Sequence, residues 1–373
     1  MQKKSKERNS FMQKKLLING NFLCRNLTGI ERFAYEICGR LDELLVSNKE
    51  EFLKVSILLP ANAKTFPDYK KIEIIPAKYL TSFPKWDLFY FPKMCRSHKA
   101  IGLNFSNTAP IIFNTGYAFL HDIYAHDFPG DFSSKKDKLI RLYSQIHYKN
   151  IARHAKKVFT VSEFSKNQIQ KAYGLKDERI SVIPNGWDHF KKIEEDDSIF
   201  ESFPLLLEKP FFFTLGSLQK RKNLKWILQY AKNHPAQNFA ISGKAIGGMH
   251  TDELGELSEQ KNIIFLGYVN DGQVKSLMKK CRAFVFPSYY EGFGIPPLEA
   301  LSVGAKIIVA KSASLPEIYG EAASYINAES TDCNLEELAS FTPKSEEIER
   351  VLNKFTYQNS AKLLYNELKE ALL

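Results

Sequence analysis

Residues 283–301 read AFVFPSYYEGFGIPPLEAL, and this stretch indicates how the chain folds. Its first four residues are apolar, as in a strand that is buried on both faces of a parallel sheet. A loop with Gly292 and Gly294 follows, and then two prolines, which are favoured in the first turn of a helix. A buried strand, a glycine loop and a helix together make one βα unit.

The same pattern recurs along the chain, whose 373 residues suffice for two domains. Short runs rich in Ile, Val and Phe alternate with helical patterns, which predicts the α/β class with two Rossmann-like, doubly wound parallel sheets. The predicted strands are 15–18, 55–59, 72–75, 88–91, 111–113, 158–161 and 180–183, then 211–215, 239–241, 263–266, 283–286 and 306–309. A polar segment at 187–209 suits a linker. We expect a disordered tail at 1–14 and domains at 15–190 and 191–355.

Charge is spread unevenly over the two halves. Residues 1–190 hold 31 Lys and Arg against 18 Asp and Glu, whereas residues 191–373 hold 21 against 24. A basic first half and a nearly neutral second half suggest different partners. The overall composition, 44% apolar and 25% charged, is that of a globular protein and excludes collagen, coiled coils and disordered chains.

Cysteines and targeting signals bear on the compartment. The five cysteines are odd in number and far apart, with no C-x-x-C pair, which argues against a disulfide framework or a zinc knuckle and favours a reducing cytoplasm. No apolar run has the length of a signal peptide or of a membrane span. Because Met-Gln-Lys-Lys occurs at both Met1 and Met12, either methionine could be the start.

The strand predicted at 211–215 leads into Gly216 and then into Lys220-Arg221-Lys222-Asn223 before a helix. Cationic side chains and free backbone N–H groups at a helix start bind anions well. A solvated basic helix start is the alternative. The spacing differs from that of a Walker A loop.

Glu291 and Glu299 are eight residues apart and flank the helix start in the segment quoted first. Two carboxylates in this arrangement could hold different parts of one polyhydroxylated ligand, while the N–H groups of residues 292–295 face a phosphate. A glycosidase carboxylate pair is one alternative, and a helix cap followed by a packed helix is another.

Two weaker signals lie in the first half. Thr28 and Glu31 have capping-box spacing, and Gly29 between them permits close backbone approach. His121-Asp122 and His126-Asp127 follow the strand predicted at 111–113. No third ligand cluster accompanies them, so we expect no metal site there.

These motifs, taken in order, resemble glycosyltransferase family four over about residues 15–370. The resemblance rests on the glycine loop after the first strand, His121-Asp122, Val161-Ser-Glu-Phe-Ser165, Ile183-Pro-Asn-Gly186, Gly216 with Arg221-Lys222-Asn223, Ser242-Gly-Lys244, Leu266-Gly-Tyr-Val269, Glu291 with Glu299, and Ser314-Leu-Pro-Glu-Ile318. It implies the GT-B fold, in which two Rossmann-like domains face a cleft. It also implies a transferase that retains the anomeric configuration, with an acceptor domain at 15–190, a donor domain at 191–355 and a last helix at 356–373 that crosses back.

The resemblance implies a role for each matching residue. Arg221 and Lys222 would neutralise the donor diphosphate, and Glu291 with the amides of Gly292, Phe293 and Gly294 would hold the donor sugar. Glu299 would bind the ribose, and Ser242, Gly243, Lys244 and Tyr268 would line the base pocket. Gly29 would approach the phosphate from the other domain, and His121 would lie near the sugar.

The chain departs from the family pattern at two positions. Tyr357 stands where tryptophan is usual, and Ser217 stands where some relatives place a phosphate-binding arginine, which leaves Arg221 and Lys222 more of the charge. Preorganised cations and helix N–H groups would stabilise the charge that develops on the leaving diphosphate. Because no D-x-D motif is present, we expect no metal and no other cofactor. The resemblance implies attack on the face that the diphosphate leaves, with a phosphate oxygen helping to deprotonate the acceptor.

The segment 135–157 has eight Lys and Arg against one Asp, with apolar residues near helical spacing. Such a helix could lie on an anionic membrane face, or it could be an ordinary surface helix with a buried apolar stripe. Because many relatives use lipid-linked acceptors, we expect a nucleotide-sugar donor, a lipid-linked saccharide acceptor and a peripheral position on the inner face of the cell membrane. Lipopolysaccharide or capsule assembly fits this, with a rhamnose, mannose or glucosyl-type donor.

Two other functions stay open on the sequence. A nucleotide-sugar epimerase of similar fold would convert a donor without an acceptor. A basic protein that binds nucleic acid is less favoured, because aromatic residues are not interleaved with the basic ones as stacking would require.

Overall fold

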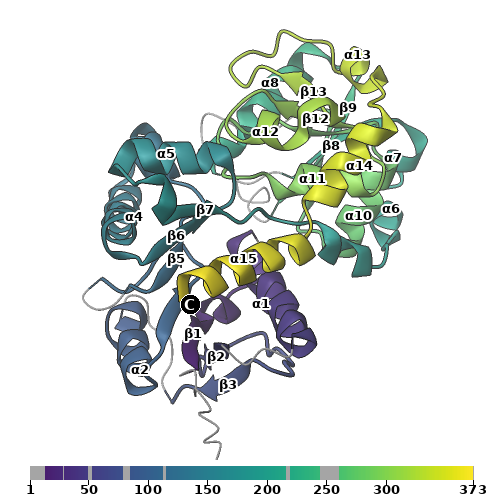
Figure 1. Ribbon diagram of the computed structural model, residues 1–373. Helices are drawn as coiled ribbons and strands as arrows, with labels where there is room; N and C mark the ends of the chain where they lie inside the picture. Colours follow the sequence, from purple (N-terminus) through teal and green to yellow (C-terminus); the bar gives the residue numbers. More distant parts are fainter. Residues whose placement is uncertain are drawn as a thin grey trace, which may run out of the picture.

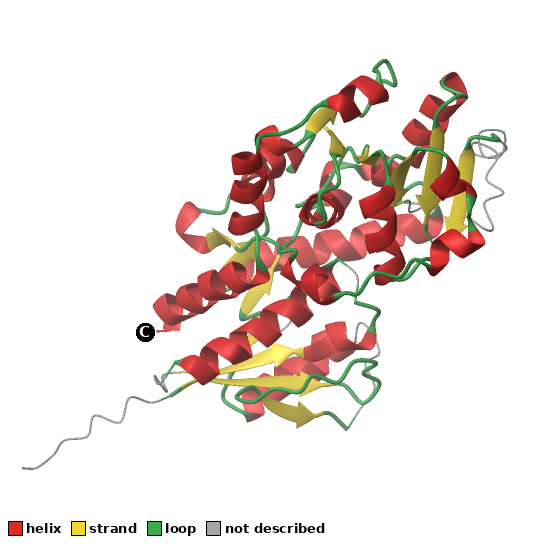
Figure 2. Ribbon diagram, turned by 90° about the vertical axis from the view of Figure 1, so that its right-hand side faces the viewer, coloured by secondary structure: helices red, strands yellow, loops and turns green. Residues whose placement is uncertain are grey.

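The computed structural model describes residues 13–27, 29–48, 53–78, 85–111, 115–215, 219–243 and 260–372. Two parallel sheets with helices on their faces form two lobes, which stand at lower left and upper right in Figure 1 and can be followed from the side in Figure 2. This is the fold class that the sequence predicts.

The first sheet has seven strands in the order β3-β2-β1-β4-β5-β6-β7, and the second has six in the order β10-β9-β8-β11-β12-β13. The strands of the first are β1 (Lys14–Asn19), β2 (Leu53–Leu59), β3 (Glu73–Pro76), β4 (Ile101–Asn104), β5 (Tyr117–Phe119), β6 (Lys157–Thr160) and β7 (Ile180–Val182). Those of the second are β8 (Phe211–Leu215), β9 (Asn238–Ser242), β10 (Ile263–Gly267), β11 (Ala283–Phe286), β12 (Ile307–Ala310) and β13 (Ser324–Ile326). Central strands such as β11 are fully buried, which explains their unbroken apolar runs.

The helices that cover the sheets are α1 (Ile30–Ser47), α2 (Phe91–Ser97), α3 (Tyr124–Asp127), α4 (Lys135–His154), α5 (Glu163–Tyr173), α6 (Ser198–Ser202), α7 (Leu205–Glu208), α8 (Leu224–Asn233), α10 (Asp271–Lys280), α11 (Ile295–Ser302), α12 (Leu315–Tyr319), α13 (Leu335–Ser340), α14 (Ser345–Lys354) and α15 (Tyr357–Leu372). The short segments that matter below are η2 (Trp86–Tyr90), η5 (Asp188–Lys192) and η6 (Lys220–Lys222).

The last helix returns to the first lobe. Figure 1 shows α15, in yellow, lying along α1, and the two helices pack against each other. Lys157 on β6 forms an ion pair of 2.5 Å with Glu367 on α15. The backbone N–H of Tyr357 donates to Asp188 at 2.6 Å, where the chain passes between the lobes. Tyr357 itself is fully buried, so the position where the family usually has tryptophan serves as a packing site.

One strand prediction was wrong, and another lies largely outside the described residues. The run 88–91 belongs to η2 and to the first residue of α2. Within the run Phe91 is buried whereas Phe89 is exposed, and the buried Trp86 and Asp87 precede it in η2. Periodicity alone does not separate a short apolar strand from a helix turn. Of the run 111–113, Ile111 lies in a bend, and the other two residues fall outside the described ranges. Strands β4 and β5 flank this position. With four and three residues, and three in β13, these strands are too short for the pattern to have indicated them.

Candidate active site

The second sheet reverses its strand order between β8 and β11, which are neighbours although two strands separate them in sequence. Ligands of open α/β sheets bind at such a switch point, beyond the carboxyl ends of the strands. The segment after β8 continues to η6, with Arg221 and Lys222, and the segment after β11 carries Glu291. The backbone N–H of Tyr289 and the hydroxyl of Ser288 both donate to the carbonyl of Arg221, at 3.0 and 2.8 Å, and so hold the two segments together.

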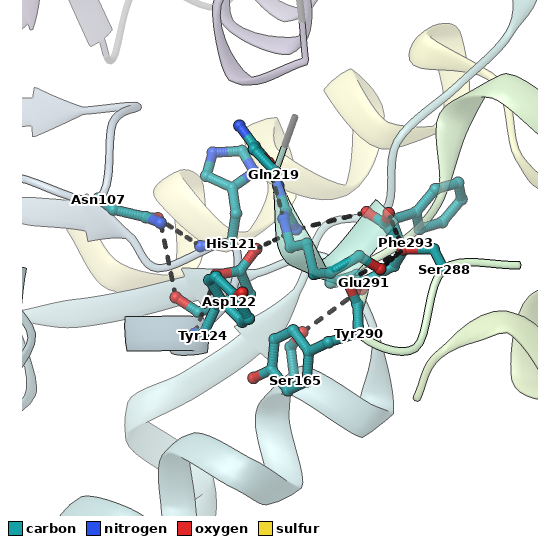
Figure 3. A network of polar contacts seen from close by, with 12 residues as sticks. Asn107, His121, Asp122, Tyr124, Ser165, Gln219, Ser288, Tyr290, Glu291 and Phe293 are labelled. Atoms are coloured by element: carbon teal, nitrogen blue, oxygen red, sulfur yellow. Dashed lines mark hydrogen bonds and ion pairs between the residues drawn. The ribbon is translucent and has the colours of Figure 1, made fainter. Parts of the chain in front are cut away.

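Four charged side chains meet at this point, and Figure 3 labels the two carboxylates among them, Asp122 and Glu291. Lys222 donates to Oε1 of Glu291 at 2.7 Å, and Arg221 lies 3.4 Å from Oε2. The same guanidinium lies 3.5 Å from Asp122, which belongs to the first lobe. The hydroxyl oxygen of Ser288 also lies 2.6 Å from Oε1 of Glu291, so its single proton serves either this carboxylate or the carbonyl of Arg221. Two cations and two carboxylates thus balance one another across the boundary between the lobes.

The ionisation of this cluster follows from its surroundings. Burial opposes the charge on Glu291, but Lys222 and Arg221 outweigh it and lower the pKa of the Glu291 carboxyl. Burial and the like charge of Arg221 lower the pKa of Lys222, and Glu291 opposes this shift. An anion that enters here can therefore form ion pairs with Arg221 and Lys222 beside those that they form with Glu291.

His121 lies on the first-lobe side of the cluster. Its Nε2–H donates to the carbonyl of Phe105 at 2.8 Å, and its ring packs against Phe33 and Phe119. Burial lowers the pKa of His121 to about 4. The imidazole is therefore neutral near pH 7, with its proton on Nε2.

Two helices begin at this place from opposite sides. Gly29 precedes α1 with φ of +50°, and Gly294 precedes α11 with φ of +90°, a region of backbone space that glycine tolerates best. Neither cap residue makes a side-chain capping bond. The first turn of α1 can therefore offer backbone N–H groups to a ligand, whereas at α11 Pro296 and Pro297 carry no N–H and only the N–H groups of Gly294 and Ile295 can serve. The predicted capping box of Thr28 and Glu31 is wrong, because the N-cap residue of α1 is Gly29. Thr28 lies outside the described residues, and Glu31 forms an ion pair with Arg25.

A cleft of about 1100 Å³ joins these features. Every predicted site residue that the structure describes lines it: Gly29, His121, Arg221, Lys222, Ser242, Gly243, Tyr268, Glu291, Gly292, Phe293, Gly294 and Glu299. Lys244, predicted with this set, lies outside the described ranges. Glu299 lies 3.1 Å from Nε2 of His189 on η5, and Tyr268 is 68% exposed at the rim.

Several lining residues were not predicted as site residues. Asn185 and His189 follow β7, and Asp271 on α10 forms an ion pair of 2.5 Å with Arg32 on α1. A signal existed for Asn185, which follows a predicted strand in the Ile183-Pro-Asn-Gly186 motif. The pairing of Arg32 with Asp271 has no local sequence signal, because it depends on how the lobes face each other.

Neither a metal site nor a membrane-spanning helix is found among the described residues. Within the described ranges, no group of three or more His, Cys, Asp and Glu side chains is arranged for a metal ion. Among the helices of the same ranges, none combines the length and the apolar character of a membrane crossing.

Comparison with known families covers both lobes. Residues 27–189 match the model of Glycosyltransferase Family 4, and residues 195–354 match the model of Glycosyl transferases group 1. The chain belongs to the glycosyltransferases. The epimerase and the nucleic-acid-binding protein, which the sequence left open, are not favoured by these matches.

The glycosyltransferase also resembles individual proteins. It is 31% identical to O-antigen chain mannosyltransferase B of Escherichia coli over 182 residues, which are 45% of this chain and 46% of that protein. It is 25% identical to O-antigen chain mannosyltransferase RfbU of Salmonella typhimurium over 271 residues, 71% of this chain and 72% of that one. The chain thus spans about half the length of the first relative and under three quarters of the second.

A solved structure shares the fold. Sucrose-phosphate synthase from Thermosynechococcus elongatus superposes with a TM-score of 0.70 at 15% identity, over 96% of this chain and the whole of that one. The glycosyltransferase therefore has the GT-B fold, as the sequence motifs predict.

Proposed function

We propose that this glycosyltransferase moves a hexosyl group, a mannosyl group first of all, from a nucleoside diphosphate sugar to a hydroxyl of a saccharide acceptor. The observation that carries the proposal is the meeting of Arg221, Lys222 and Glu291 with two uncapped helix starts in one cleft. The cations and the N–H groups suit a diphosphate, and the carboxylate suits sugar hydroxyls. The mannosyl group is proposed because both O-antigen relatives are named mannosyltransferases.

In the proposed reaction, the bond between the sugar and the diphosphate breaks, and charge develops on the leaving oxygens. Arg221, Lys222 and the N–H groups at the starts of α1 and α11 would stabilise that charge without a metal ion. Glu291 would hold the sugar, and neutral His121 would lie beside it from the other lobe. The resemblance to family four supports retention of configuration, with attack on the face that the diphosphate leaves.

The nucleoside would lie on the second lobe. Glu299, which His189 holds at 3.1 Å, would accept hydrogen bonds from the ribose hydroxyls. Tyr268, at the cleft rim, would cover the base together with the segment that begins at Ser242. Base, ribose, diphosphate and sugar would then follow one another along the cleft.

A panel of nucleotide sugars tests the proposal. Release of the nucleoside diphosphate is measured for each donor, with and without a membrane lipid extract and with and without a metal chelator. We expect GDP-mannose to be turned over, faster with the extract, and equally with the chelator. Release from no donor contradicts a transferase. Isomerisation of a donor in the absence of any acceptor would establish the epimerase instead.

The proposed acceptor is a lipid-linked saccharide, and α4 is the proposed membrane contact. Leu139, Leu142 and Ile146 on this helix are 67%, 54% and 45% exposed, whereas its buried side chains lie nearer its C-terminal end. These exposures support the membrane contact over an ordinary surface helix with a buried apolar stripe. Exposed apolar side chains between lysines and arginines fit an anionic bilayer.

Vesicle sedimentation tests the membrane contact. We expect the protein to sediment with vesicles that contain phosphatidylglycerol and to remain in solution with phosphatidylcholine alone. Leu139→Ser should weaken sedimentation, whereas Leu207→Ser, at an exposed position of the other lobe, should leave it unchanged. Equal behaviour of the two variants would rule α4 out as the contact.

A further inference from the structure

Two sequence motifs of the chain have no part in the proposed chemistry, and in the structure they meet. One is 161–165, at the end of β6 and the start of α5 in the first lobe. The other is 314–318, at the start of α12 in the second. They lie on either side of the loop that carries Glu291, whose neighbour Gly292 contacts the first lobe directly.

The carbonyl of Gly292 is bonded by the first lobe. The hydroxyl of Ser162 donates to it at 2.6 Å, and that of Ser165 at 3.4 Å. Both serines are buried, with exposures of 0% and 1%. A Cβ on Gly292 would lie 2.5 Å from the carbonyl oxygen of His121, so only glycine lets the two lobes approach this closely. Figure 3 shows Ser165, Glu291 and Phe293 grouped at this point.

The second lobe also contacts the start of α5, the helix that carries Ser165. One carboxylate oxygen of Glu317 accepts the backbone N–H of Glu163 at 2.9 Å, and the other accepts that of Phe164 at 2.8 Å. These N–H groups belong to the first turn of α5 and have no acceptor within the helix. A carboxylate of one lobe thus caps a helix of the other, although Glu317 is exposed and its contribution is smaller than that of the buried serine.

The bond from Ser162 sets the direction of a peptide group at the proposed sugar site. Because a trans peptide is planar, fixing the carbonyl of Gly292 also fixes the N–H of Phe293, which points the opposite way. Phe293 follows Glu291 and precedes α11, and all of these residues line the cleft. If the lobes separated, Gly292 would lose its donors and the loop would lose this constraint.

We propose that Ser162, on the first lobe, is a positioning residue for the loop that carries Glu291 on the second lobe, and that it orients this loop through its hydrogen bond to Gly292. The hydrogen bonds of Glu317 to the start of α5 are a second contact that holds the lobes together. The donor-sugar site is then complete only when the lobes are closed. The catalytic consequence of this inference rests on the proposed function, whereas the restraint of the loop by Ser162 is a structural claim that does not depend on it. The two are separated by pairing a kinetic measurement with one that requires no activity.

The test compares Ser162→Ala with Ser134→Ala in the full chain. Ser134 caps α4 as Ser162 caps α5, each accepting the N–H three residues on, at 3.1 and 3.0 Å, but Ser134 is remote from Gly292. The control therefore removes an equal helix cap and leaves the loop untouched. Measured are kcat with the best donor, the Kd of the free nucleoside diphosphate, and hydrogen–deuterium exchange of peptides that cover 287–294.

We expect Ser162→Ala to lower kcat about tenfold, since a buried carbonyl loses its donor, while the Kd changes less than about twofold. Amide exchange in 287–294 should rise in this variant and not in Ser134→Ala. If Ser162→Ala fails to fold, Glu317→Ala at an exposed position should show the same changes at smaller size, with Glu321→Ala as its control.

Equal kcat and equal exchange in Ser162→Ala and Ser134→Ala would overturn the proposal. A loss of nucleotide affinity as large as the loss of kcat would also overturn it, because general damage to the cleft would then explain both. If the wild-type protein turned over no nucleotide sugar, the proposed function would fall, and amide exchange would still decide whether Ser162 fastens the loop.

Discussion

The two sheets share a topology, yet their switch points differ in chemistry. In the first sheet, β1 and β4 end at Asn19 and Asn104, whose side chains bond each other at 3.1 Å, and Asn19 donates to Asp87 at 2.9 Å. In the second, β8 and β11 lead to Arg221, Lys222 and Glu291. The first switch point is filled with buried amides and one carboxylate, whereas the second carries opposite charges at the edge of a cleft.

The difference in accessibility matters as much as the difference in charge. Asp87 has no exposed surface, and burial raises its pKa, although bonds from Asn19 and Thr108 oppose the shift. Arg221 and Lys222 keep about a fifth of their side chains exposed, at 20% and 19%. The switch point of the first lobe is thus buried and structural, whereas that of the second lobe is accessible to an anion. The first lobe reaches the cleft at the start of α1, with Gly29, and through His121 and Asp122.

The largest expected effect is at the charged switch point. Lys222→Ala removes a charged hydrogen bond of about 1.5–3 kcal/mol, so turnover should fall roughly tenfold to a hundredfold. Lys225→Ala, at an exposed position on α8, is the matched control and should behave like the wild type. The measurement is nucleotide release with the best donor. Near-normal release by Lys222→Ala would mean that this cation does not serve the diphosphate.

Glu291→Ala should separate the sugar from the nucleotide. We expect sugar-dependent turnover to fall by about tenfold, because hydroxyl contacts to a carboxylate are lost, while the affinity for the free nucleoside diphosphate changes less. Calorimetry with the diphosphate and with the intact donor gives the two affinities. Equal losses for both ligands would refute a sugar-specific role.

Asp87→Ala tests the claim that the first switch point is a scaffold. It removes the acceptor of one N–H of the Asn19 amide, which keeps its bond to Asn104, and the acceptor of the part-buried Thr108 hydroxyl, which should lower the free energy of unfolding by about 1–3 kcal/mol. The affinity for the nucleoside diphosphate should stay as in the wild type. Urea titration measures the first quantity, with Asp68→Ala at an exposed position as control. An unchanged stability together with lost activity would make Asp87 a ligand-binding group and remove the contrast between the sheets.

The sequence was sufficient for the charged switch point because its residues follow predicted strands directly. Strand 283–286 is an unbroken apolar run and 211–215 is apolar except for Thr214, and the residues after such strands converge wherever the strands are neighbours. The first switch point was not predicted, because 88–91 resembles a strand while Asp87 points inward from a helical segment. The contact of Ser162 with Gly292 joins residues 130 positions apart, and only the docking of the two lobes creates it.

The smallest expected effect concerns the neutral side of the cleft. A histidine in the unfolded chain titrates near pH 6.5, whereas His121 in the folded protein has a pKa of about 4. Between these values the unfolded state binds the proton and the folded state does not, so stability must fall as the pH falls. His121 should contribute roughly 1 kcal/mol of the loss between pH 7 and pH 5.5. Urea titrations of the wild type and His121→Gln at the two pH values measure this share, and parallel losses in both proteins would show that His121 is not buried in its neutral form.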